Sequence, residues 1–452
     1  MAAHDLRDRS VTFERKPPAR VVEPAGGGET NVRKTHGFRL LALAGALMLF
    51  SCSLSGGGGS VDGSNGATEY TVTYASNGAS SGDVPVDSRQ YTQGATVTVL
   101  GNTKGLSKMN WTFAGWSADE AGAGSAYSAG DTFRMGTRDV TLYAQWSAWL
   151  SYVTAWGSAG TGDGQFGLNP GFAQEGPLSI AADPVGCIYV VDTMNCRIEK
   201  FDSSGNFLLK WGSAGSTNGK FSLPTRVCAD GAGNIYVLDV GTDLVQKFDS
   251  AGTFIAKIGG PGTGNGQFSF GGNDGAGVAV DSSGNVYVLD DGNSRVEKFT
   301  TTNGTTYTCA ATWGSHGSAN GQLSIGSQAN LVVDGSGTVY VADPGNHRIV
   351  TFSSTGTFLS NIDLAGKYEA YFTIAMDPAN QRLYVLDVYG CTIHRFALDG
   401  TYVSSWSNRG TGTGQILYPN SFTYSRGYLY VLDFNVDLAT TGNNRIEKYQ
   451  VY

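Results

Sequence analysis

Residues 189–198, Tyr-Val-Val-Asp-Thr-Met-Asn-Cys-Arg-Ile, hold the pattern that decides the fold, because their first four residues recur along the chain. The copies of Tyr-Val-x-Asp begin at Tyr189, Tyr236, Tyr287, Tyr340, Tyr384 and Tyr430, at spacings of 47, 51, 53, 44 and 46 residues. Around each copy the same order returns: an apolar segment, a turn, the tetrapeptide, a loop, a segment such as Arg-Ile-Glu-Lys-Phe, and an aromatic-rich segment. This order predicts four strands per unit, and four short strands about every 48 residues is the period of a β-propeller blade.

The composition of the chain agrees with an all-β globular protein. Glycine accounts for 65 of 452 residues and charged residues for 15%, which excludes coiled coils and long charged helices. Aromatic residues make up 11%, which is too many for a disordered or collagen-like chain. The net charge of −8 repels phosphate backbones, so we expect no nucleic-acid partner.

The two ends of the repeat region predict how the ring closes. The sixth copy ends after its third strand at residues 445–449, whereas an additional strand at 152–157 precedes the first copy and matches the fourth strand at 207–212. We expect this N-terminal strand to complete the last blade, which removes an exposed sheet edge. The predicted fold class is therefore all-β: a six-bladed β-propeller of four-stranded blades over residues 148–452, closed by an N-terminal strand and preceded by a small β-grasp-like module.

A second motif follows the tetrapeptide in most copies. Asn-x-Arg-Ile is complete at residues 195–198, 346–349 and 443–446, and nearly complete at 293–296. Together with Tyr-Val-x-Asp, it resembles the NHL repeat family of six-bladed propellers. Copies two and five depart from the family pattern, with Asp243-Leu244 and Cys391-Thr392 at the arginine position.

Residues 69–147 form a separate β-rich segment in which polar and apolar side chains alternate, as they do in half-buried strands. Its two most distinctive stretches are Phe-Ala-Gly-Trp at 113–116 and Leu-Tyr-Ala-Gln-Trp at 142–146. These resemble the Listeria-Bacteroides repeat of bacterial surface proteins, also called the internalin B-repeat, which implies a compact module often found in extracellular stalks. We interpret Trp116 and Trp146 as core residues rather than carbohydrate-stacking residues, since a domain this small needs large aromatics to build a core.

Residues 1–52 resemble the leader of a bacterial lipoprotein. An 11-residue apolar run at 40–50 follows a basic segment and precedes Ser51-Cys52, and it is too short to span a bilayer as a helix. The resemblance implies that Cys52 is lipidated and that residues 53–68 are a Gly/Ser tether. We therefore expect a lipid-anchored protein of the bacterial cell envelope, outside the cytoplasm; the alternative is a buried core helix that ends in an ordinary cysteine.

Aspartates and arginines recur together in the repeats. They could form either a catalytic or metal site or a structural contact. Each Asp precedes its Arg by five residues across a short loop, so the pair can make a charge-assisted contact. A catalytic site would normally break this symmetry, so we interpret the pairs as structural. The pairs are Asp192 with Arg197, Asp290 with Arg295 and Asp343 with Arg348.

The remaining candidates point to binding rather than to catalysis. The three propeller histidines, His316, His347 and His394, fall in different parts of their repeats, so we expect no metal site, no catalytic residue and no cofactor. Propellers commonly bind ligands on the face that carries the loops between second and third strands and the connectors between blades. The candidate rim there comprises Met194, Asn195, Asn293, Asn346, His347, Tyr368, Tyr371, Tyr389 and Phe434.

Two classes of function follow from these features. The first is a non-catalytic envelope protein, expected to be monomeric, whose propeller is a platform for an unknown protein or glycan. The alternative is a propeller hydrolase or lyase with a metal site at the central channel.

Overall fold

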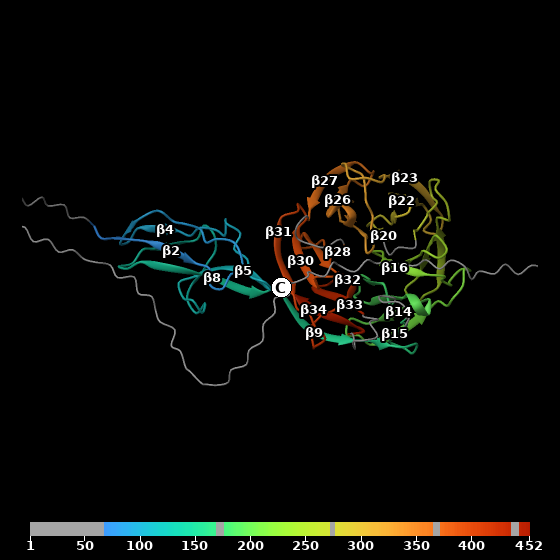
Figure 1. The fold of residues 1–452 in the computed structure, drawn as a ribbon, viewed down its shortest axis with the longest axis horizontal. Coiled ribbons are helices and arrows are strands. Elements are labelled where there is room, and N and C mark those ends of the chain that lie inside the picture. The colour runs from blue at the N-terminus through green and yellow to red at the C-terminus, as the bar shows by residue number, and fades with distance from the viewer. Residues whose placement is uncertain (1–66, 169–175, 272–275, 365–370, 435–442) are drawn as a thin grey trace, which may run out of the picture. The chain divides into compact units, whose positions relative to one another are not determined.

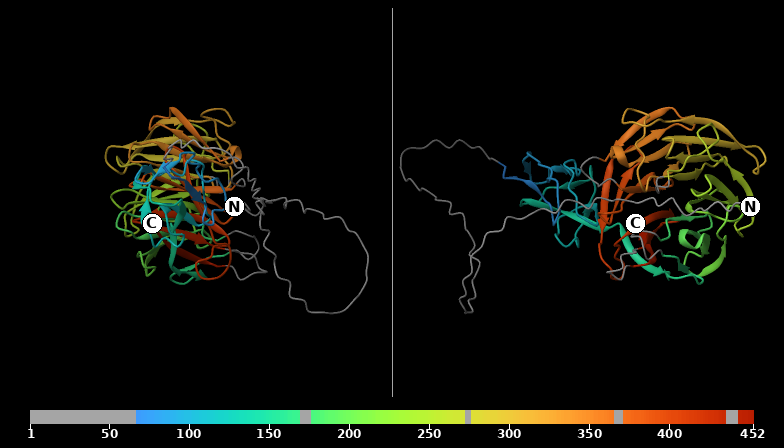
Figure 2. Two further views of the ribbon diagram at one scale, coloured as in Figure 1. Left: turned by 90° about the vertical axis from the view of Figure 1, so that its left-hand side faces the viewer. Right: turned by 45° about the vertical axis from the view of Figure 1, so that its right-hand side comes forward.

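The computed structural model describes residues 67–168, 176–271, 276–364, 371–434 and 443–452. Within these residues the repeat region forms six four-stranded antiparallel sheets, which are the blades of a β-propeller (Figure 1). The innermost strand of each blade contacts the innermost strands of both neighbouring blades, so the ring is closed. Figure 2 shows the same ring from two further directions.

In blades 1 to 5 the strands run outward from the centre in the order of the sequence. Blade 1 comprises β12 (Ser179–Ala182), β13 (Ile188–Asp192), β14 (Arg197–Phe201) and β15 (Phe207–Trp211), with the single-turn helix η1 (Thr193–Asn195) between β13 and β14. Blade 2 comprises β16 (Pro224–Ala229), β17 (Ile235–Asp239), β18 (Leu244–Phe248) and β19 (Phe254–Ile258). Blade 3 comprises β20 (Gly277–Val280), β21 (Val286–Asp290), β22 (Arg295–Thr301) and β23 (Tyr307–Trp313).

The second half of the ring repeats this arrangement. Blade 4 comprises β24 (Leu331–Val333), β25 (Val339–Asp343), η2 (Pro344–Asn346), β26 (Arg348–Phe352) and β27 (Phe358–Asp363). Blade 5 comprises β28 (Phe372–Asp377), β29 (Arg382–Asp387), β30 (Thr392–Ala397) and β31 (Tyr402–Ser407). Blade 6 comprises β32 (Pro419–Ser425), β33 (Tyr428–Asp433), β34 (Arg445–Val451) and the N-terminal strand β9 (Leu150–Trp156).

Strand β9 closes the ring as predicted. It pairs antiparallel with β34, so that Trp156 lies opposite Ile446 and Tyr152 lies opposite Tyr449. In Figure 1 the teal strand β9 lies beside the red strand β34. The ring of Trp156 also reaches blade 1, where a Cβ added to Gly205 would stand only 2.5 Å from it. The two ends of the propeller are therefore held together by a sheet and by side-chain packing.

The Tyr-Val-x-Asp strands are the core of each blade. Every residue of β13, β17, β21 and β25 is buried, as expected for a strand that has sheet on both faces. The tyrosine hydroxyl of this motif donates to the aspartate that ends the preceding strand, at 2.9 Å from Tyr189 to Asp183 and 3.0 Å from Tyr287 to Asp281. This bond satisfies the one polar group that the buried tyrosine carries.

The lysine of Arg-Ile-x-Lys-Phe joins blades 1, 2, 3 and 6 to the next blade, whereas blades 4 and 5 have Thr351 and Arg395 at this position. Lys200 of blade 1 donates to the Ser250 carbonyl of blade 2 at 2.8 Å, while its ammonium lies 5.2 Å from the centre of the Tyr189 ring. Lys448 of blade 6 makes the corresponding bond to the Ser203 carbonyl of blade 1 at 2.7 Å. The repeat therefore encodes contacts between blades as well as the strands within them.

The segment before the propeller is a small β module with its own core. Trp116 is fully buried and donates its indole N–H to the Leu100 carbonyl at 2.9 Å, and the half-buried Trp146 packs against the same core. The prediction that both tryptophans serve the core is confirmed for this module. Its strands are β1 (Glu69–Tyr70), β2 (Val72–Ala75), β3 (Tyr91–Thr92), β4 (Thr96–Thr98), β5 (Trp111–Ser117), β6 (Ala126–Tyr127), β7 (Thr132–Arg134) and β8 (Val140–Ala148). The module's larger sheet has the order β2-β8-β5-β6, and a two-stranded ladder of β10 (Ser158–Ala159) and β11 (Gln165–Phe166) follows β9.

The predicted leader, Cys52 and most of the tether lie outside the described residues. In the part of the chain that the structure describes, no helix has the length and apolar character needed to cross a membrane.

Candidate functional site

The recurrent Asp/Arg pairs are buried clamps on the connectors between blades. The Nε of Arg197 donates to Asp192 at 2.7 Å, and its other nitrogens donate to the carbonyls of Thr161, Gly162 and Gln165 in the preceding connector. Blades 3 and 4 repeat this arrangement, with Nε to carboxylate distances of 2.9 Å for Arg295 and 2.8 Å for Arg348. One guanidinium thus holds a whole turn of the connector backbone in place. This structural role accounts for the recurrence of the arginine, and no catalytic role is needed to explain it.

The asparagines of the candidate rim belong to the same clamps. Asn195 donates its amide to Asp192 at 2.7 Å and to the Gly160 carbonyl at 3.0 Å. Asn293 and Asn346 make the equivalent two bonds in blades 3 and 4. These amide donors are therefore occupied within the protein.

One other member of the candidate rim, Phe434, does not line an accessible surface. Phe434 is fully buried and packs edge-to-face on Phe166 at 5.1 Å, so its prediction as a rim residue is wrong. The reason is that the residue after the second strand turns back into the core between blades 6 and 1. Tyr368 lies outside the described residues.

The structure brings two of the predicted rim residues together. Tyr371, just before β28, and Tyr389, in the loop after β29, meet edge-to-face with their ring centres 4.9 Å apart. Both side chains are half-buried, as are Met194 and His347 on the equivalent loops of blades 1 and 4. Blade 5 is one of the two copies that lack the arginine clamp, and Tyr389 stands at the position that Met194 has in blade 1.

A glutamate two residues after the arginine is a part of the clamp that the sequence reasoning did not single out. Glu199 is fully buried, lies 2.7 Å from Arg197 and accepts the Gly164 N–H at 3.1 Å. Burial raises its pKa to about 7, although Arg197 opposes that shift. Blade 2 lacks the arginine and has Gln246 here, which accepts the Gly219 N–H at 2.9 Å. The signal was present in the sequence: Arg-x-Glu recurs at 197–199, 295–297 and 445–447.

We predict that Glu199→Gln makes the propeller less sensitive to rising pH. The folded-state pKa lies above the ordinary value, so the contribution of Glu199 is fully present below pH 4.5 and is lost as pH rises toward 7. Relative to the variant, the wild type should lose up to about 3 kcal/mol of unfolding free energy over that window. Urea unfolding at pH 5 and pH 8 measures this difference. The reverse change, Gln246→Glu, should make the free energy of unfolding fall further as pH rises, through the new carboxyl in blade 2. The same pH dependence of unfolding in the wild type and both variants would contradict the prediction.

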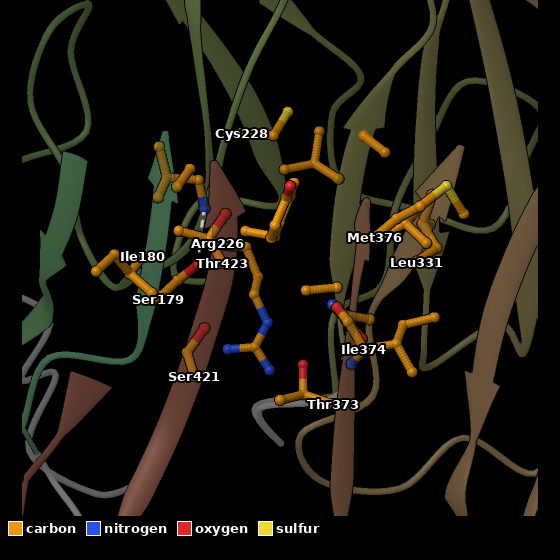
Figure 3. A pocket seen from close by; sticks show the side chains of 18 of the residues that line it. Ser179, Ile180, Arg226, Cys228, Leu331, Thr373, Ile374, Met376, Ser421 and Thr423 are labelled. Carbon is orange, nitrogen blue, oxygen red and sulfur yellow. Dashed lines mark hydrogen bonds between the residues drawn. The ribbon is translucent and has the colours of Figure 1, made fainter. Parts of the chain in front are cut away.

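The central channel contains a cavity of about 280 Å³ that is lined by the innermost strands of all six blades (Figure 3). Its lining is uneven in polarity. Hydroxyl groups and a guanidinium occur near the starts of four strands, at Ser179, Arg226, Thr373 and Ser421, whereas the apolar Leu331 begins β24. Cys228 and Met376 lie farther along β16 and β28. Two side chains tie neighbouring blades here: Ser179 accepts the Val227 N–H at 3.2 Å, and the Asn330 amide donates to the Ile374 carbonyl at 2.8 Å and accepts the Ile374 N–H at 2.9 Å.

The channel and the histidines offer no evident metal centre in the described residues. There, no group of three or more His, Cys, Asp or Glu side chains is placed to hold a metal ion. His316 lies in a connector, His347 in the loop between β25 and β26, and His394 on β30. The five described cysteines, at 187, 196, 228, 309 and 391, are free thiols.

Two family models match parts of the chain. Residues 70–145 match the Listeria-Bacteroides repeat domain, and residues 276–299 match the NHL repeat. The second match covers β20, β21 and the first part of β22. Both resemblances noted in the sequence are therefore confirmed for these segments.

Two curated relatives, both from Evansella cellulosilytica, share a short segment with the chain. One, named "Putative membrane protein", is 38% identical over 79 residues, and the other, named "Putative Gly-rich membrane protein", is 41% identical over 91 residues. Each match covers 18% of this chain but only 12% and 10% of the relatives. The chain thus spans about a tenth of the length of the curated relatives it matches.

Solved structures similar to this chain share little sequence with it. A streptogramin B lyase is 13% identical with a TM-score of 0.42, and the match covers 61% of this chain and 93% of the lyase chain. A protein of unknown function from Bacteroides thetaiotaomicron is 16% identical with a TM-score of 0.44, covering 72% and 80%. A virginiamycin B lyase from Staphylococcus aureus is 9% identical with a TM-score of 0.41, covering 61% and 95%. At these scores the lyase activity is not carried over to this chain.

Proposed function

We propose that this chain is a lipid-anchored, non-catalytic protein of the bacterial cell envelope whose propeller binds a protein or glycan. The β module acts as a spacer between the anchor and the propeller. The Listeria-Bacteroides repeat and the names of the two curated relatives support a place at the membrane. The acidic net charge favours partners other than nucleic acid, and the propeller is taken to act as a monomer.

The pair of Tyr371 and Tyr389 is the observation that carries the binding role. Tyrosine supplies a large, rigid contact area and a hydroxyl, which is why it is enriched where proteins bind partners. The two rings support one another at 4.9 Å and stay half-exposed on the face where propellers commonly bind. The repeated aspartates and arginines, by contrast, are used inside the clamps, which favours a platform over a catalyst.

The experiment is a binding screen of the purified full-length protein against glycans and envelope extracts, repeated with Tyr371→Ala and Tyr389→Ala. Loss of a buried tyrosine contact should weaken partner binding by about 2 kcal/mol or more. Tyr452→Ala is the control, because Tyr452 is 71% exposed at the chain end, away from these loops. Undiminished binding by both variants would overturn the assignment of the tyrosine pair.

The same protein can be tested for the alternative, a metal-dependent hydrolase or lyase. Elemental analysis and thermal melts with and without chelator distinguish the two functions, because bound metal stabilises the folded state by mass action. A stoichiometric metal and a chelator-dependent melting temperature would contradict the non-catalytic proposal.

The lipid anchor gives a further prediction. Cys52→Ser should release the protein from the membrane fraction and abolish its metabolic labelling by a fatty acid, because the thiol is the proposed acylation site. Cell fractionation and labelling measure both effects. Retention in the membrane by an unlabelled variant would contradict the anchor.

A further inference from the structure

The connection between the β module and the propeller is a single buried residue. Strand β8 of the module ends at Ala148 and strand β9 of blade 6 begins at Leu150, so only Trp149 lies between them. Trp149 is 1% exposed and belongs to the hydrophobic core shared by blades 5 and 6. Its ring stacks on Tyr384 of β29 at 6.2 Å, and its indole N–H donates to the Ser405 carbonyl of β31 at 3.2 Å. Flexible linkers are typically rich in Gly and Ser, so this connection is not a hinge.

Asn110 of the module pairs with the outer edge of blade 5 as a strand residue would. It precedes β5, and its backbone N–H donates to the Ser405 carbonyl at 3.0 Å. Its side-chain amide donates to the Ser407 carbonyl at 2.9 Å and accepts the Ser407 N–H at 2.6 Å. The side chain thus reproduces the two bonds that a backbone residue makes in an antiparallel ladder. The outer strand of a sheet exposes unpaired N–H and C=O groups, and Asn110 occupies three such groups of β31.

Arg395 of β30 holds the same junction from the propeller side. It is 6% exposed and stands where blades 1, 2, 3 and 6 have a lysine. Its Nη2 donates to the Thr112 hydroxyl of the module at 2.7 Å, and its Nη1 donates to the main-chain oxygen of Tyr452 at 3.2 Å. The guanidinium also lies 4.7 Å from the centre of the Trp149 ring. A guanidinium fork can reach two partners and stack on an aromatic ring, whereas a lysine ends in one nitrogen. The departure from the repeat at Arg395 therefore serves the module.

We propose that the outer edge of blade 5 is a docking surface for the β module, and that module and propeller act as one rigid unit. Residues 66–452 form one compact unit, which agrees with this docking. Asn110 supplies the strand-like contact, Arg395 supplies the contact from the propeller, and Trp149 supplies the inflexible connection. A spacer of this kind presents the propeller in a fixed orientation. The inference depends neither on the lipid anchor nor on the partner of the tyrosine pair.

Hydrogen–deuterium exchange on the purified full-length protein tests the docking, because the Ser407 N–H has the Asn110 side chain as its acceptor. Asn110→Gly removes this side chain and suits the left-handed backbone at the residue, where φ is +68°. The Ser407 amide should exchange about 10- to 100-fold faster in this variant, since an edge amide without a partner is open to water. Met109→Ala is the matched control: Met109 is the preceding residue and is 60% exposed, so the exchange of Ser407 should stay unchanged.

Arg395→Lys tests the second contact. It restores the residue that other repeats have, so the blade should fold, but it removes the guanidinium that reaches Thr112. The Ser407 amide should exchange about 10-fold faster there, because a hydrogen bond that holds the module in place is lost. If circular dichroism shows that Asn110→Gly does not fold, Arg395→Lys alone decides.

The amides of β15, the outer strand of blade 1, are the internal reference and should keep their exchange rates in every variant. Unchanged exchange of Ser407 in a folded Asn110→Gly or Arg395→Lys variant would overturn the docking. An equal rise in β15 would overturn it as well, because the substitution would then act on the stability of the whole propeller.

Discussion

A chain that begins at residue 158 should lose the cooperative unfolding of the propeller, whereas one that begins at residue 68 should keep it. The difference between them includes β9, which supplies the fourth strand of blade 6 and pairs with β34 along residues 446–451. Each lost hydrogen bond costs on the order of 0.5–1.5 kcal/mol, and each buried aromatic several more. The fully buried Trp149 and the half-buried Trp156 leave with the strand, as does Tyr152, which is 38% exposed. Against a total stability of about 5–15 kcal/mol, this loss should unfold the ring.

Thermal melts followed by circular dichroism measure this effect. A chain that lacks only residues 148–157 but keeps the β module separates loss of the strand from loss of the module, and it should behave like the chain that begins at 158. Melting temperatures within a few degrees of the chain that begins at 68 would mean that β9 does not close the ring.

The fold was predictable because its determinants repeat. Tyr-Val-x-Asp marks the buried second strand in all six copies, and the phase of the copies places the missing strand at residues 152–157. The same repetition indicated that Asp192 and Arg197 are structural. A sequence feature that occurs in several copies can be checked from one copy to the next. A strand or an Asp/Arg pair that occurred only once would not allow this check.

The candidate site was harder to predict because its residues do not repeat. Arg226 has no equivalent in blades 1, 3 and 5, where the innermost strands carry Ser179, Gly277 and Thr373 at the same register. Only the closed ring brings these residues together. Phe434 shows the opposite problem: its position after a second strand resembles that of exposed loop residues, but the closure of blades 6 and 1 buries it. Asn195 was also difficult to assign. Its place in a loop suggests a side chain available for binding, but its amide donates to the buried carboxylate of Asp192.

Arg197→Leu should destabilise the propeller by about 3–5 kcal/mol, which is the cost of leaving buried charges without their partner. Arg197 is 8% exposed and Asp192 and Glu199 are both 0% exposed, so water cannot replace the guanidinium. The connector loses its three carbonyl contacts as well. Urea unfolding at pH 8 measures the change. Lys210→Leu, which breaks an exposed ion pair with Asp163 in the same blade, is the control and should cost no more than about 1 kcal/mol.

Blade 2 shows how the defect can be repaired, because it has Leu244 and Gln246 where blade 1 has Arg197 and Glu199. There the carboxylate of Asp239 is held by the backbone N–H groups of Ser222 and Leu223 at 2.9 and 2.6 Å, with no arginine in the pair. Adding Glu199→Gln to Arg197→Leu therefore removes one of the two stranded charges and keeps a side-chain oxygen that can accept the Gly164 N–H. The double variant should recover about 1–3 kcal/mol relative to Arg197→Leu alone, a coupling of the size expected for groups in one network. Simple additivity of the two substitutions would show that Glu199 does not depend on Arg197, and that the clamp is the Asp/Arg pair alone.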